Sequence, residues 1–401
     1  MMHRRLIVWH ATLAVAAAVA SACASSREQR APVAVAETEA TAAVSKPGAA
    51  ASPSPEGAAV PTTPATIEPP SAAASAAFGH GMTLVSSDAS AALAAFDSAR
   101  RDSPQFYLAQ HNAGILLAGR GDNELASAAF RAALEVKPDF EPAAVAQARL
   151  FELDGKPGDA ERVLRDLAAH NAKAVLVRAA LAQLLARSGR FDEARTQAIE
   201  VLHIDERQAG AMLALGMVYR RQTQLELAQL ALNQAIEGDG TLGEAYNELG
   251  LVFLAQDDNA RAVQAFERAA AARPDVAAIQ NNLGALKTEV GAYAGAVTAL
   301  ERATALGPAR PEYYLNLGNA LRGEQRIVEA AAAYQKALEV GRGDRQALYN
   351  LGVLYLDNEV PETDKMARDQ KCVDYLQRYL KATAPSGDER RRVEEYLAPA
   401  S

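Results

Sequence analysis

The chain has 401 residues, of which 49% are hydrophobic and 22% are charged, and its formal net charge is −8. An acidic chain lacks the basic stripe that nucleic-acid phosphates require, so the composition argues against a nucleic-acid partner. Two cysteines, Cys23 and Cys372, are too few for a disulfide framework.

Residues 1–22 have the pattern of an export signal. Arg4 and Arg5 precede an apolar run from Leu6 to Ala20, which is too short to be a membrane-spanning helix in front of a soluble domain. Small residues, Ala20 to Ala22, then stand directly before Cys23. This junction allows two interpretations, ordinary signal cleavage or lipoprotein processing.

The junction resembles a bacterial lipobox, and this resemblance implies cleavage before Cys23 and acylation of that cysteine. Several acyl chains anchor a protein stably where a single chain is reversible. Ala24 stands where an Asp would resemble an inner-membrane retention signal. The resemblance therefore implies an outer-membrane lipoprotein that faces the periplasm.

Residues 23–72 are expected to form a disordered tether behind the lipidated cysteine. Ala, Pro, Ser and Thr dominate this segment, and it has almost no large apolar side chains. Such a composition cannot bury enough surface to offset the entropy of ordering. The segment would space the rest of the chain from the membrane.

From residue 73 to 382 the sequence is built of repeats with a period of about 34 residues. Gly250, Gly284 and Gly318 lie 34 residues apart, and each follows a leucine that has an asparagine one or two places before it. An alanine column occupies eight successive repeats, at Ala92, Ala126, Ala160, Ala194, Ala228, Ala262, Ala296 and Ala330. A fixed period of this size predicts stacked helical hairpins that complete one another's cores. We expect no insertion or deletion between residues 73 and 344, with His80 in the glycine place of an atypical first repeat.

Each column has a predicted role. Glycine and alanine are expected where helices cross closely. Large residues are expected to fill the wedge between repeats, at Phe130, Leu164, Phe266, Leu300 and Tyr334. Further glycines fall in the turn between the two helices of a repeat, where a positive φ is useful, at Gly121, Gly155, Gly189 and Gly291.

These columns resemble the tetratricopeptide repeat (TPR) pattern over most of the chain. The resemblance implies an all-α, right-handed TPR solenoid of about nine helix-turn-helix repeats. Proteins of this superfamily mostly bind other proteins. The fold is thus predicted more specifically than the function.

The ninth repeat begins at Tyr349 and then departs from the pattern. A polar stretch over residues 357–371 interrupts it, and aligning Cys372 with the alanine column implies eight extra residues in the turn. This insertion is either functional or a tolerated surface loop. A capping-box pattern beginning at Ser386 predicts a final helix to Leu397, in a C-terminal segment over residues 383–401.

The sequence lacks recognisable catalytic and metal-binding motifs. None of the six histidines is spaced from another as a pair of metal ligands would be, and no H-E-x-x-H, C-x-x-C, G-x-S-x-G or phosphate-binding loop occurs. We therefore expect no enzyme activity, no catalytic residue, no metal, no cofactor and no small-molecule substrate. An enzyme with an unrecognised site is the alternative.

The TPR resemblance places the first helix of each repeat on a concave face. That face would receive a row of carboxamides and two basic residues, namely Asn112, Asn247, Asn281, Asn282, Asn316, Asn319, Asn350, Arg220 and Arg221. The row resembles the asparagine ladder with which some TPR grooves hold an extended peptide, since a carboxamide both donates and accepts hydrogen bonds. The alternative is that these asparagines bond only within the stack.

The whole layout resembles the TPR lipoproteins of bacterial gliding-motility machinery. The lipobox, the tether, the tandem repeats and the closing motif over residues 349–357 carry this resemblance. It implies a non-enzymatic scaffold that binds envelope proteins or extended peptide segments, with a lipid anchor as its only membrane contact. Type IV pilus assembly lipoproteins and adaptors for peptidoglycan hydrolases or synthases share the architecture and are the alternatives.

Overall fold

The computed structural model describes residues 67–307, 310–358, 364–382 and 387–397. The predicted signal over residues 1–22, Cys23 and the tether up to residue 66 lie outside the described residues. Contacts divide the described chain after Ala272. We call residues 67–272 the N-terminal unit and residues 273–397 the C-terminal unit, and each is described by itself.

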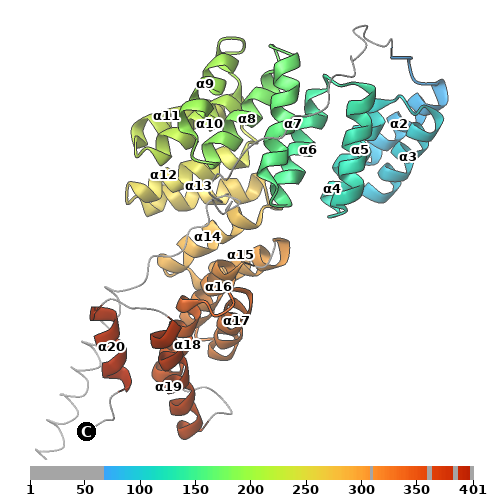
Figure 1. The fold of residues 1–401 in the computed structure, drawn as a ribbon. Coiled ribbons are helices and arrows are strands. Elements are labelled where there is room, and N and C mark those ends of the chain that lie inside the picture. Colours follow the sequence, from blue (N-terminus) through green and yellow to red (C-terminus); the bar gives the residue numbers. More distant parts are fainter. Residues whose placement is uncertain (1–66, 308–309, 359–363, 383–386, 398–401) are drawn as a thin grey trace, which may run out of the picture. The chain divides into compact units, whose positions relative to one another are not determined.

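Every regular element in the described residues is a helix, as the repeat pattern predicts (Figure 1). In the N-terminal unit the helices are α2 (Ala72–Leu84), α3 (Ala89–Asp102), α4 (Tyr107–Gly119), α5 (Asn123–Val136), α6 (Glu141–Leu153), α7 (Pro157–His170), α8 (Val175–Arg187), α9 (Phe191–Leu202), α10 (Ala209–Arg221), α11 (Leu225–Gly238), α12 (Gly243–Ala255) and α13 (Asn259–Ala272). In the C-terminal unit they are α14 (Ala277–Glu289), α15 (Tyr293–Leu306), α16 (Pro311–Gly323), α17 (Ile327–Val340), α18 (Arg345–Asp357), α19 (Lys365–Ala382) and α20 (Gly387–Leu397). The helices pack two by two, from α2 with α3 to α18 with α19, so each repeat is one helical hairpin.

The glycine and alanine columns allow the two helices of each hairpin to pack closely. All eight alanines of the predicted column have 0% exposure. A methyl group added at Gly114 or Gly250 would lie 2.6 Å from a ring carbon of Phe130 or Phe266, so only glycine fits beside these rings. The predicted role of the small residues is therefore confirmed.

The large residues do not lie where the sequence placed them. We expected Phe130 and Phe266 to fill the wedge between repeats, but each ring covers the glycine of its own repeat. The reason is helical spacing, because a residue sixteen positions after the glycine falls opposite it when the hairpin closes. The same pairing joins Gly284 to Leu300 and Gly318 to Tyr334.

The first repeat is more regular than predicted. Gly81, and not His80, occupies the crossing, and a methyl group there would lie 2.6 Å from Phe96. Gly81 precedes Ala92 by one residue fewer than Gly114 precedes Ala126. The expectation of an uninterrupted period from residue 73 is thus wrong by one residue in the first turn.

The hairpin turns contain one left-handed residue at an equivalent place in most repeats. Gly121, Gly155, Gly189 and Gly291 have φ between 71° and 83°, as predicted from their positions. In three other repeats a side chain is forced into this conformation, at Thr223 (φ 59°), Asp257 (φ 58°) and Gln325 (φ 63°). Backbone strain of this kind is largest for a β-branched residue.

Replacing Thr223 by glycine is therefore expected to stabilise the chain by about 1 kcal/mol. The glycine removes the clash between Cβ and the backbone at φ 59°. The converse change, Gly189→Thr, should destabilise by a similar amount, because Gly189 occupies the equivalent place at φ 77°. Urea unfolding of the two variants measures both changes. Equal midpoints for Thr223→Gly and the wild type would contradict the reasoning.

The ninth hairpin, α18 and α19, accommodates the eight extra residues that the sequence implied. Cys372 takes the alanine place with 4% exposure, and Leu376 covers Gly352 as Phe266 covers Gly250. The expected long polar turn is wrong in form, because α19 already begins at Lys365. About half of the insertion thus lengthens the helix, because Cys372 is the eighth residue of α19 whereas Ala330 is the fourth residue of α17. Burial raises the pKa of the Cys372 thiol, with smaller contributions from Asp369 and Asp357.

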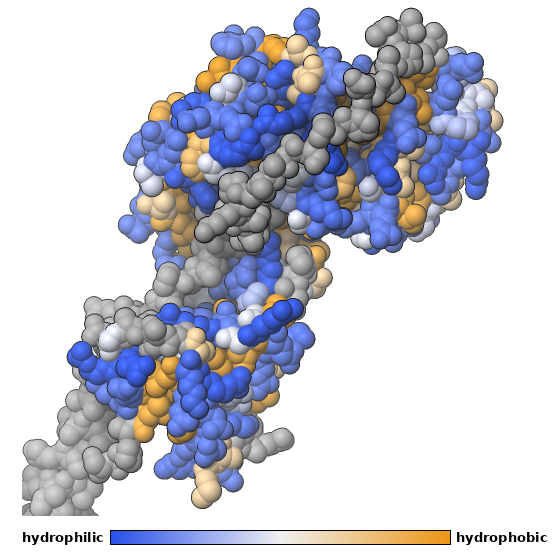
Figure 2. Space-filling model, in the orientation of Figure 1, coloured by the Kyte–Doolittle hydropathy of each residue, from blue (hydrophilic) through white to orange (hydrophobic). Residues whose placement is uncertain are grey.

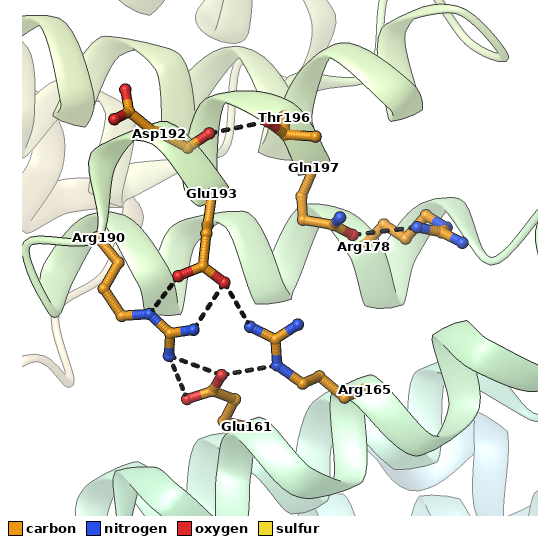
Figure 3. A network of polar contacts seen from close by, with 8 residues as sticks. All are labelled: Glu161, Arg165, Arg178, Arg190, Asp192, Glu193, Thr196 and Gln197. Atoms are coloured by element: carbon orange, nitrogen blue, oxygen red, sulfur yellow. Dashed lines mark hydrogen bonds and ion pairs between the residues drawn. The ribbon is translucent and has the colours of Figure 1, made fainter.

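Neighbouring second helices are joined by a closed network of charges in the N-terminal unit (Figure 3). Arg190 forms two hydrogen bonds with Glu161 of α7, at 2.7 and 2.8 Å, and Arg165 donates to Glu193 of α9 at 2.9 Å. Burial works against ionisation of Glu161, but the hydrogen bonds from Arg165 and Arg190 outweigh it and lower the pKa. The network holds two adjacent repeats in register.

The surface carries no continuous apolar band on the face drawn in Figure 2, where hydrophilic residues separate smaller apolar patches. Small apolar patches of this kind are ordinary for a protein surface. Among the described helices, none combines the length and the apolar character needed to cross a bilayer.

Candidate binding face

The C-terminal unit brings five of the predicted asparagines onto successive first helices. Asn281 and Asn282 lie on α14, Asn316 and Asn319 on α16, and Asn350 on α18. We call these five residues the carboxamide face. Their spacing follows from the repeat, since residues one period apart fall at the same place on neighbouring first helices.

The first link of this face joins α14 to α16. The amide of Asn316 donates to Oδ1 of Asn281 over 2.9 Å. Asn281 in turn has its nitrogen 3.5 Å from Oδ1 of Asn282. All three side chains are buried, with exposures of 3% or less. Three carboxamides of two repeats thus form one continuous line.

The second link joins α16 to α18. Asn350 donates to Oδ1 of Asn319 over 3.3 Å, and Oδ1 of Asn350 accepts from Gln346 over 3.0 Å. Oδ1 of Asn319 also accepts the hydroxyl of Tyr334 over 2.8 Å. Because both contacts of Asn319 use its oxygen, they fix which end of the carboxamide points away from the stack.

Asn319 is the member of the face best placed to meet a ligand. Its side chain is only partly buried, and none of the described residues accepts a hydrogen bond from its amide nitrogen. The nitrogen carries two donors, which suit a main-chain carbonyl of a partner. Among the other asparagines of the face, Asn350 holds Asn319 in place by donating to its oxygen.

The hydroxyl of Tyr334 supports this arrangement from the core. Tyr334 has 0% exposure, and burial raises its pKa to about 12, while the charge of Arg322 opposes the shift. The sequence did not reveal this role, because the Tyr334 position is one of the large core places. The only signal was a tyrosine where other repeats have Phe130 or Phe266.

Replacing Tyr334 by phenylalanine should therefore cost about 1 kcal/mol, since it removes one buried hydrogen bond and leaves the ring in place. Phe130 and Phe266 show that a phenylalanine ring fits this place. The reverse change, Phe266→Tyr, should also destabilise, because Leu251 stands where Asn319 provides the acceptor. Thermal unfolding measures both variants. If Tyr334→Phe is as stable as the wild type, the hydroxyl of Tyr334 does not contribute to stability.

The other predicted site residues lie in the N-terminal unit. The amide of Asn112 donates to the Leu108 carbonyl of its own helix over 2.9 Å, and the two following repeats have alanines at its place. Asn247 lies on α12 with 1% exposure. Arg220 of α10 donates to Glu248 of α12 over 2.7 Å, while Arg221 is partly exposed. Asn112 is therefore not part of a continuous row.

A second titratable group, His111, is partly buried against aromatic rings in the N-terminal unit. Its ring lies 5.6 Å from Phe130 and 5.2 Å from Phe140, and Nδ1 has no hydrogen-bond partner among the described residues. Burial lowers the pKa of His111 below its ordinary value.

The stability of the wild-type chain should therefore decrease on acidification in a way that His111→Phe removes. The unfolded chain binds a proton near pH 6.5, but the folded chain resists it, so stability is complete above that pH and falls as pH decreases towards the lowered pKa of His111. Unfolding midpoints measured between pH 8 and 5 test this. If the unfolding midpoint of His111→Phe changes with pH as much as that of the wild type, groups other than His111 cause the pH dependence.

No group of three or more His, Cys, Asp or Glu side chains suited to a metal ion occurs in the part of the chain that the structure describes. The carboxamide face also holds no histidine, cysteine or serine that could act as a nucleophile or base.

The sequence matches the model of a known protein family. A tetratricopeptide repeat model matches residues 84–142, 145–210, 213–277, 288–345 and 317–359, well over half of the chain. The chain belongs to the tetratricopeptide repeat family. TPR repeats are typically a non-catalytic fold for protein–protein interaction, and the all-α solenoid described above is that fold. A search of curated proteins finds no match.

Several solved structures are similar to this chain. One is the Cut9–Hcn1 hetero-tetramer of APC/C, with a TM-score of 0.52 and 15% identity over 81% of this chain and 69% of that chain. A TPR protein from Parabacteroides merdae gives a TM-score of 0.47 with 16% identity, over 62% and 99% of the two chains. The pilF protein of Pseudomonas aeruginosa gives 0.47 with 19% identity, over 59% and 98%.

Proposed function

We propose that this TPR protein is a non-enzymatic scaffold that holds an extended segment of a partner protein along the carboxamide face. The observation that carries the proposal is a pair of hydrogen-bonded carboxamide links, one from α14 to α16 and the other from α16 to α18. Carboxamides that recur on successive first helices match the shape of an extended peptide.

The chemistry of the face favours the main chain of the partner over its side chains. Asn319 offers its amide donors, while its oxygen is engaged by Tyr334 and Asn350. A carbonyl of the peptide main chain is the acceptor that every sequence provides. Such a scaffold would accept segments of varied sequence, with specificity coming from neighbouring contacts.

We further propose that the protein acts at the bacterial outer membrane, facing the periplasm, as part of gliding or surface-motility machinery. The support is the sequence alone, namely the lipobox resemblance at Cys23, the proline-rich tether and the closing motif of the ninth repeat. Intact-mass measurement of the membrane-extracted chain tests the anchor. An acylated N-terminal cysteine is expected, and an unmodified thiol would contradict it.

Co-purification tests the scaffold. The triple variant Asn282→Ala, Asn316→Ala, Asn350→Ala should lose its partners from detergent-solubilised envelopes with its helical circular dichroism unchanged. Asn112→Ala is the matched control, because Asn112 bonds only to its own helix, at the Leu108 carbonyl. If the triple variant retains the same partners as the control, the carboxamide face is not the binding surface. If the co-purified partners are pilus assembly proteins or peptidoglycan enzymes, the protein belongs to one of those assemblies and not to motility machinery.

A further inference from the structure

A cavity of about 340 Å³ opens between the second helices of two neighbouring repeats in the N-terminal unit. Leu134 of α5 and Val163 and Leu167 of α7 form apolar walls, and Ala144 of α6 lies beside them. Asp166, which is exposed, also lines the cavity. This cavity is separate from the carboxamide face, which lies in the C-terminal unit.

The cavity exists because Ala144 is small. The equivalent place in seven other repeats holds a large side chain, namely Gln110, Arg178, Met212, Tyr246, Gln280, Tyr314 and Leu348. The two glutamines of this column reach back to the residues that directly follow the preceding second helix. Gln110 points its amide towards the Pro104 carbonyl and Gln280 towards the Pro274 carbonyl. At Ala144 no side chain fills this space.

The adjacent repeat shows which side chain suits these walls. Arg178, one repeat after Ala144, is largely buried, with 16% of its side chain exposed. Its guanidinium donates to the Ala168 carbonyl over 3.2 Å, to Gln197 over 3.1 Å (Figure 3) and to Glu200 over 2.7 Å. One side chain thus joins a helix end and a carboxylate.

The same acceptors recur around the cavity one repeat earlier. Leu134 takes the place of Ala168, and Asp166 takes the place of Glu200. The Leu134 carbonyl lies in the last turn of α5, where carbonyls have no helical donor, and residue 138 is a proline that has no N–H group to offer. No hydrogen bond or ion pair of the Asp166 carboxylate is seen in the described part of the chain. Val163 replaces Gln197 and makes the wall more apolar.

We propose that this cavity is a binding slot for an arginine side chain of a partner protein. The aliphatic stem packs against Val163 and Leu167, and the guanidinium donates to the Leu134 carbonyl and the Asp166 carboxylate. A planar guanidinium can satisfy both acceptors at once, and a lysine ammonium fits this arrangement less well. The slot gives the N-terminal unit a contact point that is independent of the proposed peptide-binding face.

Methyl NMR of the full chain tests the slot with a small probe. Capped Gly-Arg-Gly should shift the methyl signals of Ala144, Val163 and Leu167, and capped Gly-citrulline-Gly should bind at least about tenfold more weakly, because it lacks the charge. Asp166→Asn should weaken binding of the arginine peptide at least about fivefold. Equal shifts by both peptides, or binding unaffected by Asp166→Asn, would overturn the proposal.

Filling the slot from within gives a second test. Ala144→Arg should abolish the peptide-induced shifts, since its own guanidinium occupies the two acceptors. Adding Asp166→Ala should lower the melting temperature more in the Ala144→Arg background than in the wild type. Peptide shifts that persist in Ala144→Arg would place the probe elsewhere. If Ala144→Arg does not fold, Asp166→Asn still tests the proposal, because Asp166 is exposed and its replacement should not disturb folding.

Discussion

Replacing Gly250 by alanine is expected to destabilise the chain by about 1–3 kcal/mol, although the same change at Gly79 should stabilise it by up to about 1 kcal/mol. At Gly250 the new methyl carbon would lie 2.6 Å from the ring of Phe266, which is fully buried. At Gly79, in α2, the new methyl carbon would meet no atom within 4 Å apart from its chain neighbours and its own helix backbone, so only the better helix propensity of alanine counts.

The chain itself supplies the compensating variant. In the repeat of α6 and α7, Ala148 stands in the glycine column and Leu164 in the large place. Gly250→Ala combined with Phe266→Leu should therefore recover part of the lost stability. Hydrogen exchange of peptides from α12 and α13 locates the loss, since a stacked array opens locally. If alanine destabilises the chain equally at Gly250 and at Gly79, the close contact between Gly250 and Phe266 does not determine stability.

Replacing Asn319 by aspartate is expected to lower partner recovery at least about tenfold while leaving the stack intact. Aspartate retains an oxygen that can accept from Tyr334 and Asn350, over the present 2.8 and 3.3 Å. It replaces the two outward donors by a second acceptor, which repels a peptide carbonyl. Quantitative mass spectrometry of the co-purified proteins measures the recovery.

A matched variant separates this effect from added charge. Asn112→Asp adds the same charge on α4, in the N-terminal unit, where no predicted asparagine follows in the next repeat. It should leave partner recovery unchanged. Equal recovery in Asn319→Asp and Asn112→Asp would remove Asn319 from the binding face.

The sequence predicted the fold well because its signals are local and repeated. The places of Gly250 and Ala262 recur once in each repeat, and packing at each crossing depends only on such spacings. The first turn was misplaced because His80 and Gly81 are adjacent, and the period alone cannot show a one-residue deletion. The ninth turn was misjudged because residues 365–371 are polar yet extend α19 along an exposed side.

The candidate site was predicted only in outline. The periodic asparagines placed Asn316 and Asn350 on successive first helices, but periodicity does not determine which carboxamide donates to which. Tyr334 was assigned to the core, and its hydroxyl contact with Asn319 depends on side-chain geometry across the hairpin. The cavity beside Ala144 was visible in the sequence only as one small residue in a column of large ones.

Site-specific photo-crosslinking tests most directly whether the carboxamide face holds the partner. A benzophenone amino acid at Val353, one turn after Asn350 on α18, should crosslink the partner in intact cells. The same group at Val328, which is 53% exposed on the second helix α17, should not. A partner crosslinked from Val328 and never from Val353 would contradict the account.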